Sequence, residues 1–266
     1  MRDLALAYLT IDRAGPVEQV EIAAAAGFRS VGLRILSPSH LQDRTNIVGR
    51  PDLVRAVRAA LHATGLRAFD AEVVTLSPAT SAASFAPFVA TAAELGCRFV
   101  QVVCEDGDRS RGADNLAALA RTAAEHGLGV ALEFMAFRAV RTLGEATALV
   151  NAARQSNLAV IVDALHLDRS GGSPADVARV PRSQVAYLQL CDAPAGRPAP
   201  ASLADEARHA RLHPGEGGLP LRDLLAAVGP DMPISIEVPH RDDAGLPLVE
   251  KARRAGDAAR RFLSGG

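Results

Sequence analysis

Four short apolar segments in the second half of the chain each carry an oxygen-bearing side chain near their end. The segments are 130–134, 159–163, 186–190 and 234–238, and the side chains are Glu133, Asp163, Gln189 and Glu237. Carboxylates gathered in a buried site repel one another unless a cation neutralises them. Three carboxylates and an amide form an all-oxygen donor set, which suits Mn2+ or Mg2+ and, less specifically, Co2+, and differs from Cys/His zinc sites. We therefore expect these four side chains to hold one divalent cation, although each carboxylate alone would also fit a helix cap or a salt bridge.

Two further residues have the type and position to contact a substrate. An octahedral cation with four protein ligands keeps two positions for neighbouring oxygens of a substrate, in a chelate that polarises a C–H bond. His166 follows Asp163 by three residues, so it reaches the same pocket if the chain turns there; the alternative is a surface histidine in a loop. Arg211 precedes a Pro-Gly-Glu-Gly-Gly run, and its permanent charge suits a carboxylate or phosphate.

Arg34, Glu72 and His240 are secondary candidates for binding substrate. Arg34 and Glu72 lie near the ends of earlier apolar segments, and His240 directly follows the last one. If the strand register differs by one residue from the one assumed here, these side chains belong to the barrel wall and do not face the mouth.

Eight apolar runs bounded by turn residues indicate strands, and segments of helical periodicity alternate with them. The expected strands are 4–8, 30–35, 67–74, 98–103, 129–134, 158–162, 185–190 and 233–238. The expected helices are 17–26, 52–63, 82–95, 113–125, 143–154, 175–180, 221–228 and 248–262.

The connections between these elements predict the fold class. Four of the helices end in a glycine that suits a left-handed cap and is followed at once by a strand, at Gly27, Gly65, Gly96 and Gly127. Eight units in 266 residues are about 33 residues each, a size that fits a βα repeat. We therefore predict an α/β fold, a (β/α)8 TIM barrel. A doubly wound sheet is the competitor, but no G-x-G-x-x-G follows the first strand and no P-loop is present.

The barrel accounts for residues 1–266 as a single domain. In a parallel barrel the active site lies at the C-terminal ends of the strands, where the four candidate ligands fall. The longest irregular stretch, 191–219, is rich in Ala, Pro and Gly and follows the seventh strand. Loops of that length are usually functional.

Composition excludes several classes of protein. The chain is 48% hydrophobic and 22% charged, as in folded globular proteins, and its formal net charge is −1. No basic tract marks a nucleic-acid partner, and no apolar run approaches the roughly 20 residues that span a bilayer. The first residues resemble no leader sequence, and Cys97, Cys104 and Cys191 lack metal-type spacing. We expect a cytoplasmic protein with reduced, buried thiols, a small-molecule substrate and neither a nucleic-acid nor a membrane partner.

Five segments together resemble the xylose-isomerase-like TIM barrels known as sugar phosphate isomerases/epimerases. The resemblance covers nearly the whole chain and rests on Ala131-Leu132-Glu133-Phe134, Val162-Asp163-Ala164-Leu165-His166, Leu188-Gln189-Leu190-Cys191-Asp192, Arg211-Leu212-His213-Pro214-Gly215-Glu216-Gly217 and Ser235-Ile236-Glu237-Val238. The D-x-x-H and R-x-x-P-G-E-G elements carry most of its specificity.

The resemblance implies roles for these residues. Glu133, Asp163, Gln189 and Glu237 would be the metal ligands, Glu133 and Glu237 would double as the acid–base pair, and His166 and Arg211 would bind substrate oxygens. Many ketose 3-epimerases of this family carry histidine where this chain has Gln189. Glutamine there resembles hydroxypyruvate isomerases and bacterial 3-dehydroshikimate dehydratases. Endonuclease IV of the same family needs several more histidines at strand ends, so DNA repair is disfavoured.

These features predict a metal-dependent isomerase or epimerase of a small keto sugar or hydroxy-carbonyl acid, acting by proton abstraction next to a carbonyl through a metal-bound enediolate. The first alternative is a lyase, in which the same carbanion expels a β-hydroxyl, as in 3-dehydroshikimate dehydratase. The second is a non-catalytic barrel that binds a sugar, against which the retention of all four ligands argues.

The Ala-rich segments 17–26 and 82–95 present small apolar faces. Such faces suit a homodimer or higher homo-oligomer, and they suit packing of the helices on the sheet equally well.

Overall fold

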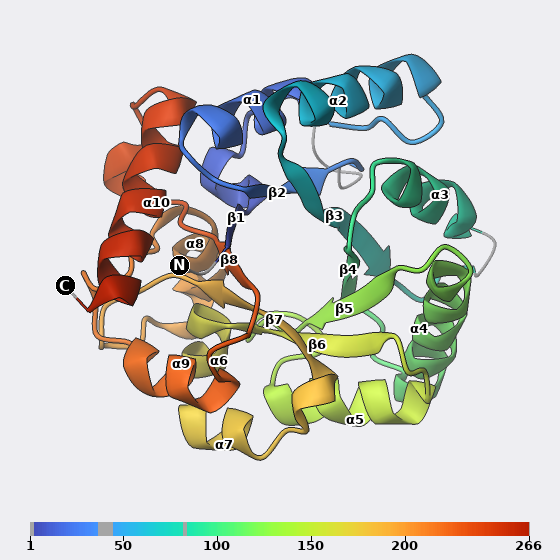
Figure 1. The fold of residues 1–266 in the computed structure, drawn as a ribbon. Coiled ribbons are helices and arrows are strands. Elements are labelled where there is room, and N and C mark those ends of the chain that lie inside the picture. Colours follow the sequence, from blue (N-terminus) through green and yellow to red (C-terminus); the bar gives the residue numbers. More distant parts are fainter. Residues whose placement is uncertain (1–2, 37–44, 82–83, 266) are drawn as a thin grey trace.

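Eight parallel strands close into a barrel in which each strand pairs with its neighbours in chain order and β8 pairs with β1 (Figure 1). The computed structural model describes residues 3–36, 45–81 and 84–265. The strands are β1 (Leu4–Leu6), β2 (Ser30–Arg34), β3 (Arg67–Leu76), β4 (Phe99–Cys104), β5 (Gly129–Glu133), β6 (Leu158–Asp163), β7 (Val185–Leu190) and β8 (Ile234–Ile236). The predicted (β/α)8 barrel is confirmed.

Helices surround the barrel on its outside (Figure 1). They are α1 (Pro16–Ala25), α2 (Pro51–Thr64), α3 (Ala86–Glu94), α4 (Arg109–Ala124), α5 (Leu143–Ala153), α6 (Ala164–Arg169), α7 (Pro174–Ala178), α8 (Leu203–His209), α9 (Leu221–Val228) and α10 (Leu248–Ser264). Gly27, Gly65, Gly96 and Gly127 have φ between 69° and 75°, which confirms the left-handed junctions expected from the sequence. No helix in the described part of the chain is both long and apolar enough to cross a membrane.

Four expectations about the elements need correction. The stretch 191–219 is not wholly irregular, because it contains a 3-10 turn at Pro200–Ser202 and helix α8. Helix α6 was not expected, β8 is shorter than the run 233–238, and Glu72 lies inside β3 rather than at its end. Residues 82–83, at the expected start of the 82–95 helix, lie outside the described residues.

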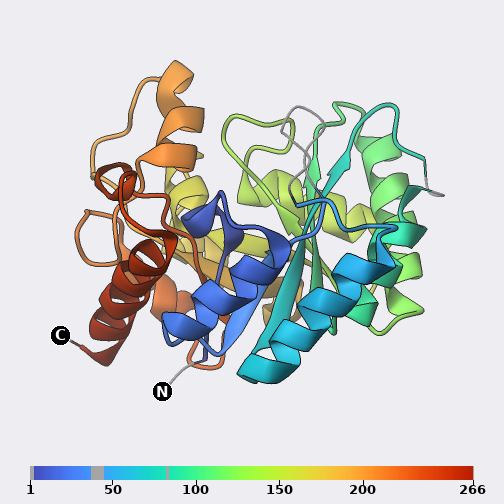
Figure 2. The same ribbon diagram turned by 90° about the horizontal axis from the view of Figure 1, so that it is seen from above.

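The inside of the barrel changes from apolar to polar along the strands. Toward the strand beginnings it is filled by a separate cluster that includes Phe69, Phe99 and Tyr187, whose ring centroids are 5.0 to 5.7 Å apart. Because side chains alternate along a strand, Gln189 faces inward two residues after Tyr187. The polar end of the barrel is therefore its C-terminal mouth. Figure 2 shows α8 projecting at one end of the barrel, with both chain termini at the other.

One buried carboxylate holds the glycine-rich loop that follows Arg211. Oδ2 of Asp192 accepts hydrogen bonds from the amides of Gly215 and Gly217, both at 3.0 Å, and Oδ1 accepts from the amides of Ala193 at 2.9 Å and Leu219 at 3.0 Å. A Cβ atom at Gly217 would lie 2.3 Å from the carbonyl oxygen of Ala193, so only glycine fits this close approach. Asp192 thus fixes the course of the loop beside the barrel mouth.

Replacing Asp192 by alanine should lower the free energy of unfolding by about 3 kcal/mol or more, because several amide groups lose their acceptor at once. Chemical denaturation measures the change. The matched control is Asp108→Ala, which removes an exposed cap that accepts from Ser110 and Arg111 at the start of α4 and should cost about 1 kcal/mol. Equal effects of the two substitutions would show that Asp192 does not organise the loop.

Candidate active site

Two carboxylates and an imidazole meet at the ends of β5 and β6. Asp163 ends β6 and caps α6, because its Oδ1 accepts the amide of His166 at 2.9 Å. This capped turn carries the His166 ring into the pocket, where its Nε2 lies 3.7 Å from Oε1 of Glu133. Potential ligand atoms of all three residues lie within 4.8 Å of one another. The turn expected after β6 is thus present, and His166 is placed to ligate an ion as well as to contact a substrate.

Arg211 connects this cluster to Glu237. Its Nη1 lies 2.6 Å from Oδ2 of Asp163, and its Nη2 lies 3.0 Å from Oε2 of Glu237. Its Nε donates to the carbonyl of Ala207 in α8 at 2.8 Å, and only 1% of the residue is exposed. Arg211 was expected to bind substrate, but here its guanidinium is buried and occupied by two carboxylates. Helix α8, which the sequence did not reveal, positions it.

Two glutamine side chains also belong to the buried site. Oε1 of Gln189 is buried and has no hydrogen-bond partner among the described residues. An unpartnered buried oxygen is uncommon and fits an atom that awaits a ligand. Gln101, in β4, donates from Nε2 to Oε2 of Glu133 at 2.6 Å. Sequence reasoning missed Gln101, although one polar residue within the apolar run Phe99–Cys104 was a signal that could have found it.

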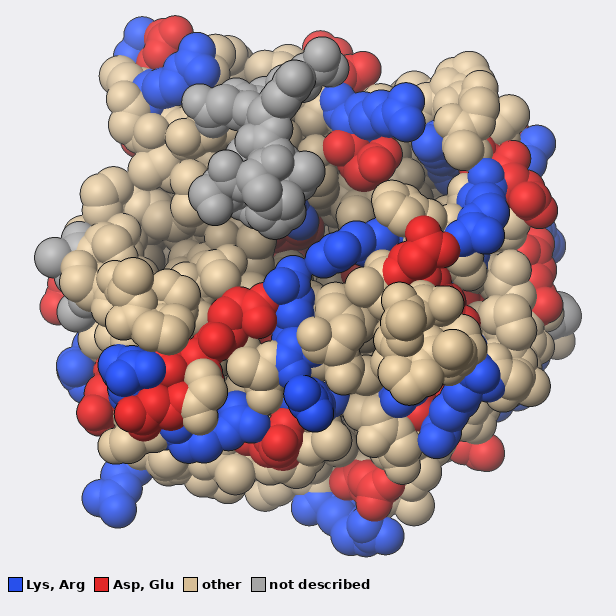
Figure 3. Space-filling model, turned by 180° about the vertical axis from the view of Figure 1, so that it is seen from behind, with Lys and Arg blue, Asp and Glu red and all other residues tan. Residues whose placement is uncertain are grey.

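The charges of the site favour a divalent cation. Glu133, Asp163 and Glu237 carry three negative charges when ionised, and Arg211 returns one positive charge. All four are 4% exposed or less. Burial, together with Glu237 and Asp163, raises the pKa of Glu133 well above its usual range. A dipositive ion would cancel the remaining charge of two. On the outer surface at this end of the molecule, the acidic and basic side chains of the described residues are interspersed (Figure 3).

Burial also sets the protonation of the neighbouring groups. It lowers the pKa of His166 to about 4, so the imidazole is neutral at neutral pH. It raises the pKa of Glu237 to about 7, against the opposing effect of Arg211. For Asp163 burial alone would raise the pKa, but Arg211 and His166 hold the pKa below its usual range.

Arg34 and Glu72 form a second ion pair beside Glu237. Oε2 of Glu72 accepts from Nε of Arg34 at 3.1 Å and from its Nη2 at 2.7 Å, and the guanidinium lies over the ring of Tyr8 at 4.7 Å. The Arg34 side chain is 14% exposed and that of Glu72 is 1% exposed. Arg34 is therefore more accessible than Arg211, and Glu72 acts as its partner.

His240 does not join the mouth cluster in the part of the chain that the structure describes. Its contacts are with His213, Glu216 and the amide of Asp242. The physical reason is that β8 ends at Ile236, so the chain has left the barrel before residue 240.

A buried acid lies below the site. Oδ2 of Asp70 accepts from the hydroxyl of Tyr187 at 2.5 Å, and Oδ1 has no partner among the described residues. Burial, together with Glu72, raises the pKa of Asp70 to about 8. The folded protein therefore keeps a proton there that the unfolded chain, with an ordinary carboxyl pKa of about 4, releases.

The metal-free protein should accordingly lose stability as the pH rises from about 4 to 8, because the unfolded state binds fewer protons in that window. Asp70→Asn cannot ionise and should make this decline shallower by up to about 1.4 kcal/mol per pH unit. Denaturation between pH 5 and 7.5 in the presence of a chelator measures both slopes, with the exposed Asp231→Asn as control. Parallel curves for wild type and Asp70→Asn would refute this assignment.

Comparison with known proteins agrees with this geometry. The model of the family described as xylose isomerase-like TIM barrel matches residues 20–263. A 3-dehydroshikimate dehydratase of Pseudomonas aeruginosa (strain PAO1) is 36% identical over 155 residues, which are 54% of this chain and 24% of that protein. The chain thus spans about a quarter of the length of this relative.

Two solved structures show the same fold. The IolI protein, which was solved with a bound zinc atom, has a TM-score of 0.82 at 16% identity, over 99% of this chain and 98% of its own. A fusion of a xylose isomerase-like TIM barrel with 4-hydroxyphenylpyruvate dioxygenase has a TM-score of 0.77 at 24% identity, over 97% of this chain and 42% of its own.

Proposed function

The chain belongs to the xylose isomerase-like TIM barrel family, and on that premise we propose that it is a divalent-metal-dependent enzyme that removes a proton next to a carbonyl group of a small hydroxy-carbonyl compound. The observation that carries the proposal is the buried cluster at the barrel mouth. Asp163 and Glu237 there share the guanidinium of Arg211, and Glu133 contacts Gln101 and His166 in the same cluster. The amide oxygen of Gln189 has no partner among the described residues.

The residues present fit a metal ion. Glu133, Asp163, Gln189 and Glu237 would hold it, and His166 is close enough to replace or join them. These donors are mainly hard oxygens, so Mn2+ or Mg2+ suits them and Co2+ is acceptable. When bound, the ion supplies Lewis acidity that polarises a carbonyl and lowers the pKa of the neighbouring C–H group.

We assign separate roles in proton transfer and substrate binding to four side chains of the site. Glu133 is the last residue of β5, and Glu237 directly follows β8. The two carboxylates therefore approach the site from different parts of the barrel and can take up and return a proton at different positions. His166 is neutral and can donate or accept one hydrogen bond with a substrate oxygen. We assign Arg34 to a substrate carboxylate, because its side chain is 14% exposed although it pairs with Glu72, whereas the side chain of Arg211 is 1% exposed and pairs with Asp163 and Glu237.

Dehydration is the reaction that we favour within this class. The 36% identity to a 3-dehydroshikimate dehydratase supports it. Glutamine at position 189 fits it too, but the sequence related that residue to hydroxypyruvate isomerases as well. A lyase of this kind removes the proton next to the carbonyl and expels the β-hydroxyl as water. The second candidate is isomerisation or epimerisation, which the pair Glu133 and Glu237 supports, because a second carboxylate could return the proton at another carbon.

Proton NMR in D2O distinguishes these reactions. Metal-loaded protein is incubated separately with 3-dehydroshikimate, hydroxypyruvate and ketohexoses. We expect 3-dehydroshikimate to give a dehydrated product, and chelation of the metal to stop the reaction. Deuterium in an isomer of another substrate would favour the second candidate instead. Neither exchange nor product with any of these compounds would contradict both and leave a barrel that binds a sugar without transforming it.

A further inference from the structure

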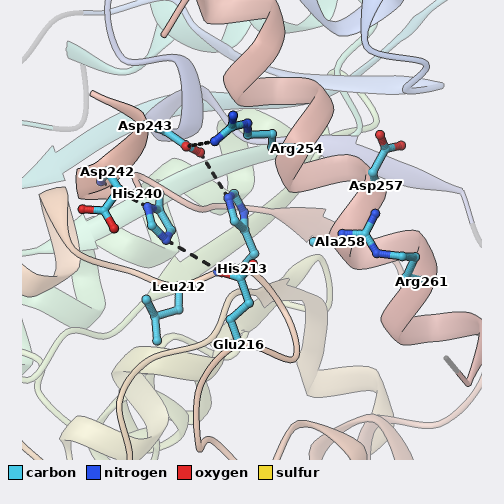
Figure 4. A pocket seen from close by; sticks show the side chains of 10 residues that line it. All are labelled: Leu212, His213, Glu216, His240, Asp242, Asp243, Arg254, Asp257, Ala258 and Arg261. Carbon is cyan, nitrogen blue, oxygen red and sulfur yellow. Dashed lines mark hydrogen bonds and ion pairs between the residues drawn. The ribbon is translucent and has the colours of Figure 1, made fainter. Parts of the chain in front are cut away.

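A second group of ligating side chains lies outside the barrel mouth. His213 belongs to the glycine-rich loop after β7. His240 directly precedes the 3-10 turn Arg241–Asp243 after β8, and Asp243 is the last residue of that turn (Figure 4). Potential ligand atoms of these three residues lie within 4.8 Å of one another. None of the three belongs to the cluster of Glu133, Asp163 and His166.

We propose that His213, His240 and Asp243 form a second metal site, which binds a transition-metal ion of the Zn2+ class. Two imidazoles and one carboxylate are a common ligand set for Zn2+, whereas the oxygen-rich mouth suits harder ions. The two sites therefore differ in the metals that they prefer.

The geometry of His213 and Asp243 supports this assignment. Nε2 of His213 lies 3.1 Å from Oδ2 of Asp243, close to the roughly 3.3 Å between two ligands of one tetrahedral Zn2+ ion. Arg254 binds the other carboxylate oxygen, Oδ1, at 2.9 Å, so Oδ2 remains directed at His213.

The imidazole of His213 is poorly satisfied without an ion. Its side chain is only 8% exposed, and its buried Nδ1 has no hydrogen-bond partner among the described residues. In the hydrogen bond with Asp243 the proton lies on Nε2, because an ionised carboxylate only accepts, and the buried Nδ1 is left as an acceptor without a donor in the described part of the chain. A metal ion that replaces this proton would take the lone pair of Nε2.

His240 supplies the third ligand after a rotation of its ring. The two imidazoles are stacked, with centroids 4.7 Å apart and 12° between their planes. Lone pairs in the planes of parallel rings do not converge, so one ring must turn about its Cβ–Cγ bond. His240 lines the adjoining pocket of about 560 Å³ (Figure 4), and turning its ring would release the hydrogen bond that its Nδ1 accepts from the amide of Asp242.

The charge of the pocket also favours a cation. Its lining includes the four carboxylates Glu216, Asp242, Asp243 and Asp257 and the two guanidiniums Arg254 and Arg261. With neutral histidines these groups sum to a charge of −2. An ion bound here would join the loop that carries His213 to the connection that carries His240. It would thus link the segment that follows Arg211 to the segment that follows Glu237.

Titration of chelator-stripped protein with Co2+ tests the proposal, because tetrahedral Co2+ absorbs strongly in the visible. The double variant Glu133→Gln/Asp163→Asn, in which the mouth is disabled, should still bind one equivalent. Adding His240→Ala should weaken this binding at least 100-fold, whereas the exposed His209→Ala should leave it unchanged.

A second measurement covers the case in which the double variant does not fold. Wild-type protein loaded with Zn2+ should contain two equivalents by elemental analysis, and His240→Ala and Asp243→Asn should each contain one. A single equivalent in wild type, or Co2+ binding that is the same with and without His240, would overturn the proposal.

Discussion

Glu237→Gln should reduce turnover and substrate deuterium exchange at least 1,000-fold while leaving the protein folded. The amide preserves the size of the side chain and can still accept a hydrogen bond from Nη2 of Arg211, which lies 3.0 Å from Oε2. It cannot take up a proton, and a positioned acid or base contributes about 100- to 10,000-fold to such reactions. Loss of one anionic ligand weakens metal binding in addition. The rate is measured by proton NMR in D2O at saturating metal.

The control for this substitution is Glu94→Gln, which makes the same chemical change at an exposed residue of α3. It should leave the rate unchanged. If Glu237→Gln retained more than a tenth of wild-type activity, Glu237 would not be a proton-transfer group.

Arg211→Met should destabilise the metal-free protein by about 3 to 5 kcal/mol, because it leaves Asp163 and Glu237 buried without their cation. Methionine keeps much of the volume, so the loss is mainly electrostatic. The two carboxylates can then relieve the repulsion only by binding protons. The deficit should therefore shrink as the pH falls toward 5, and a divalent metal should restore part of the stability at pH 7.

Urea denaturation with and without metal measures these effects. The control is Arg58→Met, which breaks an exposed pair with Glu94 at 3.4 Å and should cost less than about 1 kcal/mol. A metal-free Arg211→Met protein as stable as wild type would contradict the view that Arg211 balances the charge of the site.

The sequence predicted the barrel and the meeting of the strand-end residues because both follow from local patterns. Apolar runs of strand length alternate with helical periods, and parallel strands bring their ends to one mouth. The structure brings Asp163, His166 and Glu133 together at the expected end of the barrel.

The role of Arg211 could not be predicted in the same way. Its burial depends on helix α8, which lies in a stretch whose Ala and Pro content suggested a loop. Its two carboxylate partners are 48 and 26 residues away, so no local spacing indicates the pairing. The position of His240 outside the mouth cluster was equally hidden from local patterns, since the end of β8 decides which way the following residues turn.

Helix α6 is a short helix that its N-terminal cap starts and that hydrophobic periodicity could not predict. The six residues Ala164–Arg169 are too few to show a helical pattern, but the Asp163 side chain accepts the amide of His166 and starts the turn. The D-x-x-H spacing, in which we expected Asp163 to hold the metal and His166 to contact the substrate, is thus also a helix start.

Mn2+ binding, followed by the electron paramagnetic resonance signal of the free ion, tests the metal centre most directly. Mn2+ prefers the oxygen ligands of the barrel mouth over the imidazoles of the second site. We predict that wild type and His240→Ala each bind one equivalent and that Glu133→Gln/Asp163→Asn binds none. Equal Mn2+ binding by all three proteins, or none by wild type, would contradict a divalent metal centre at the barrel mouth.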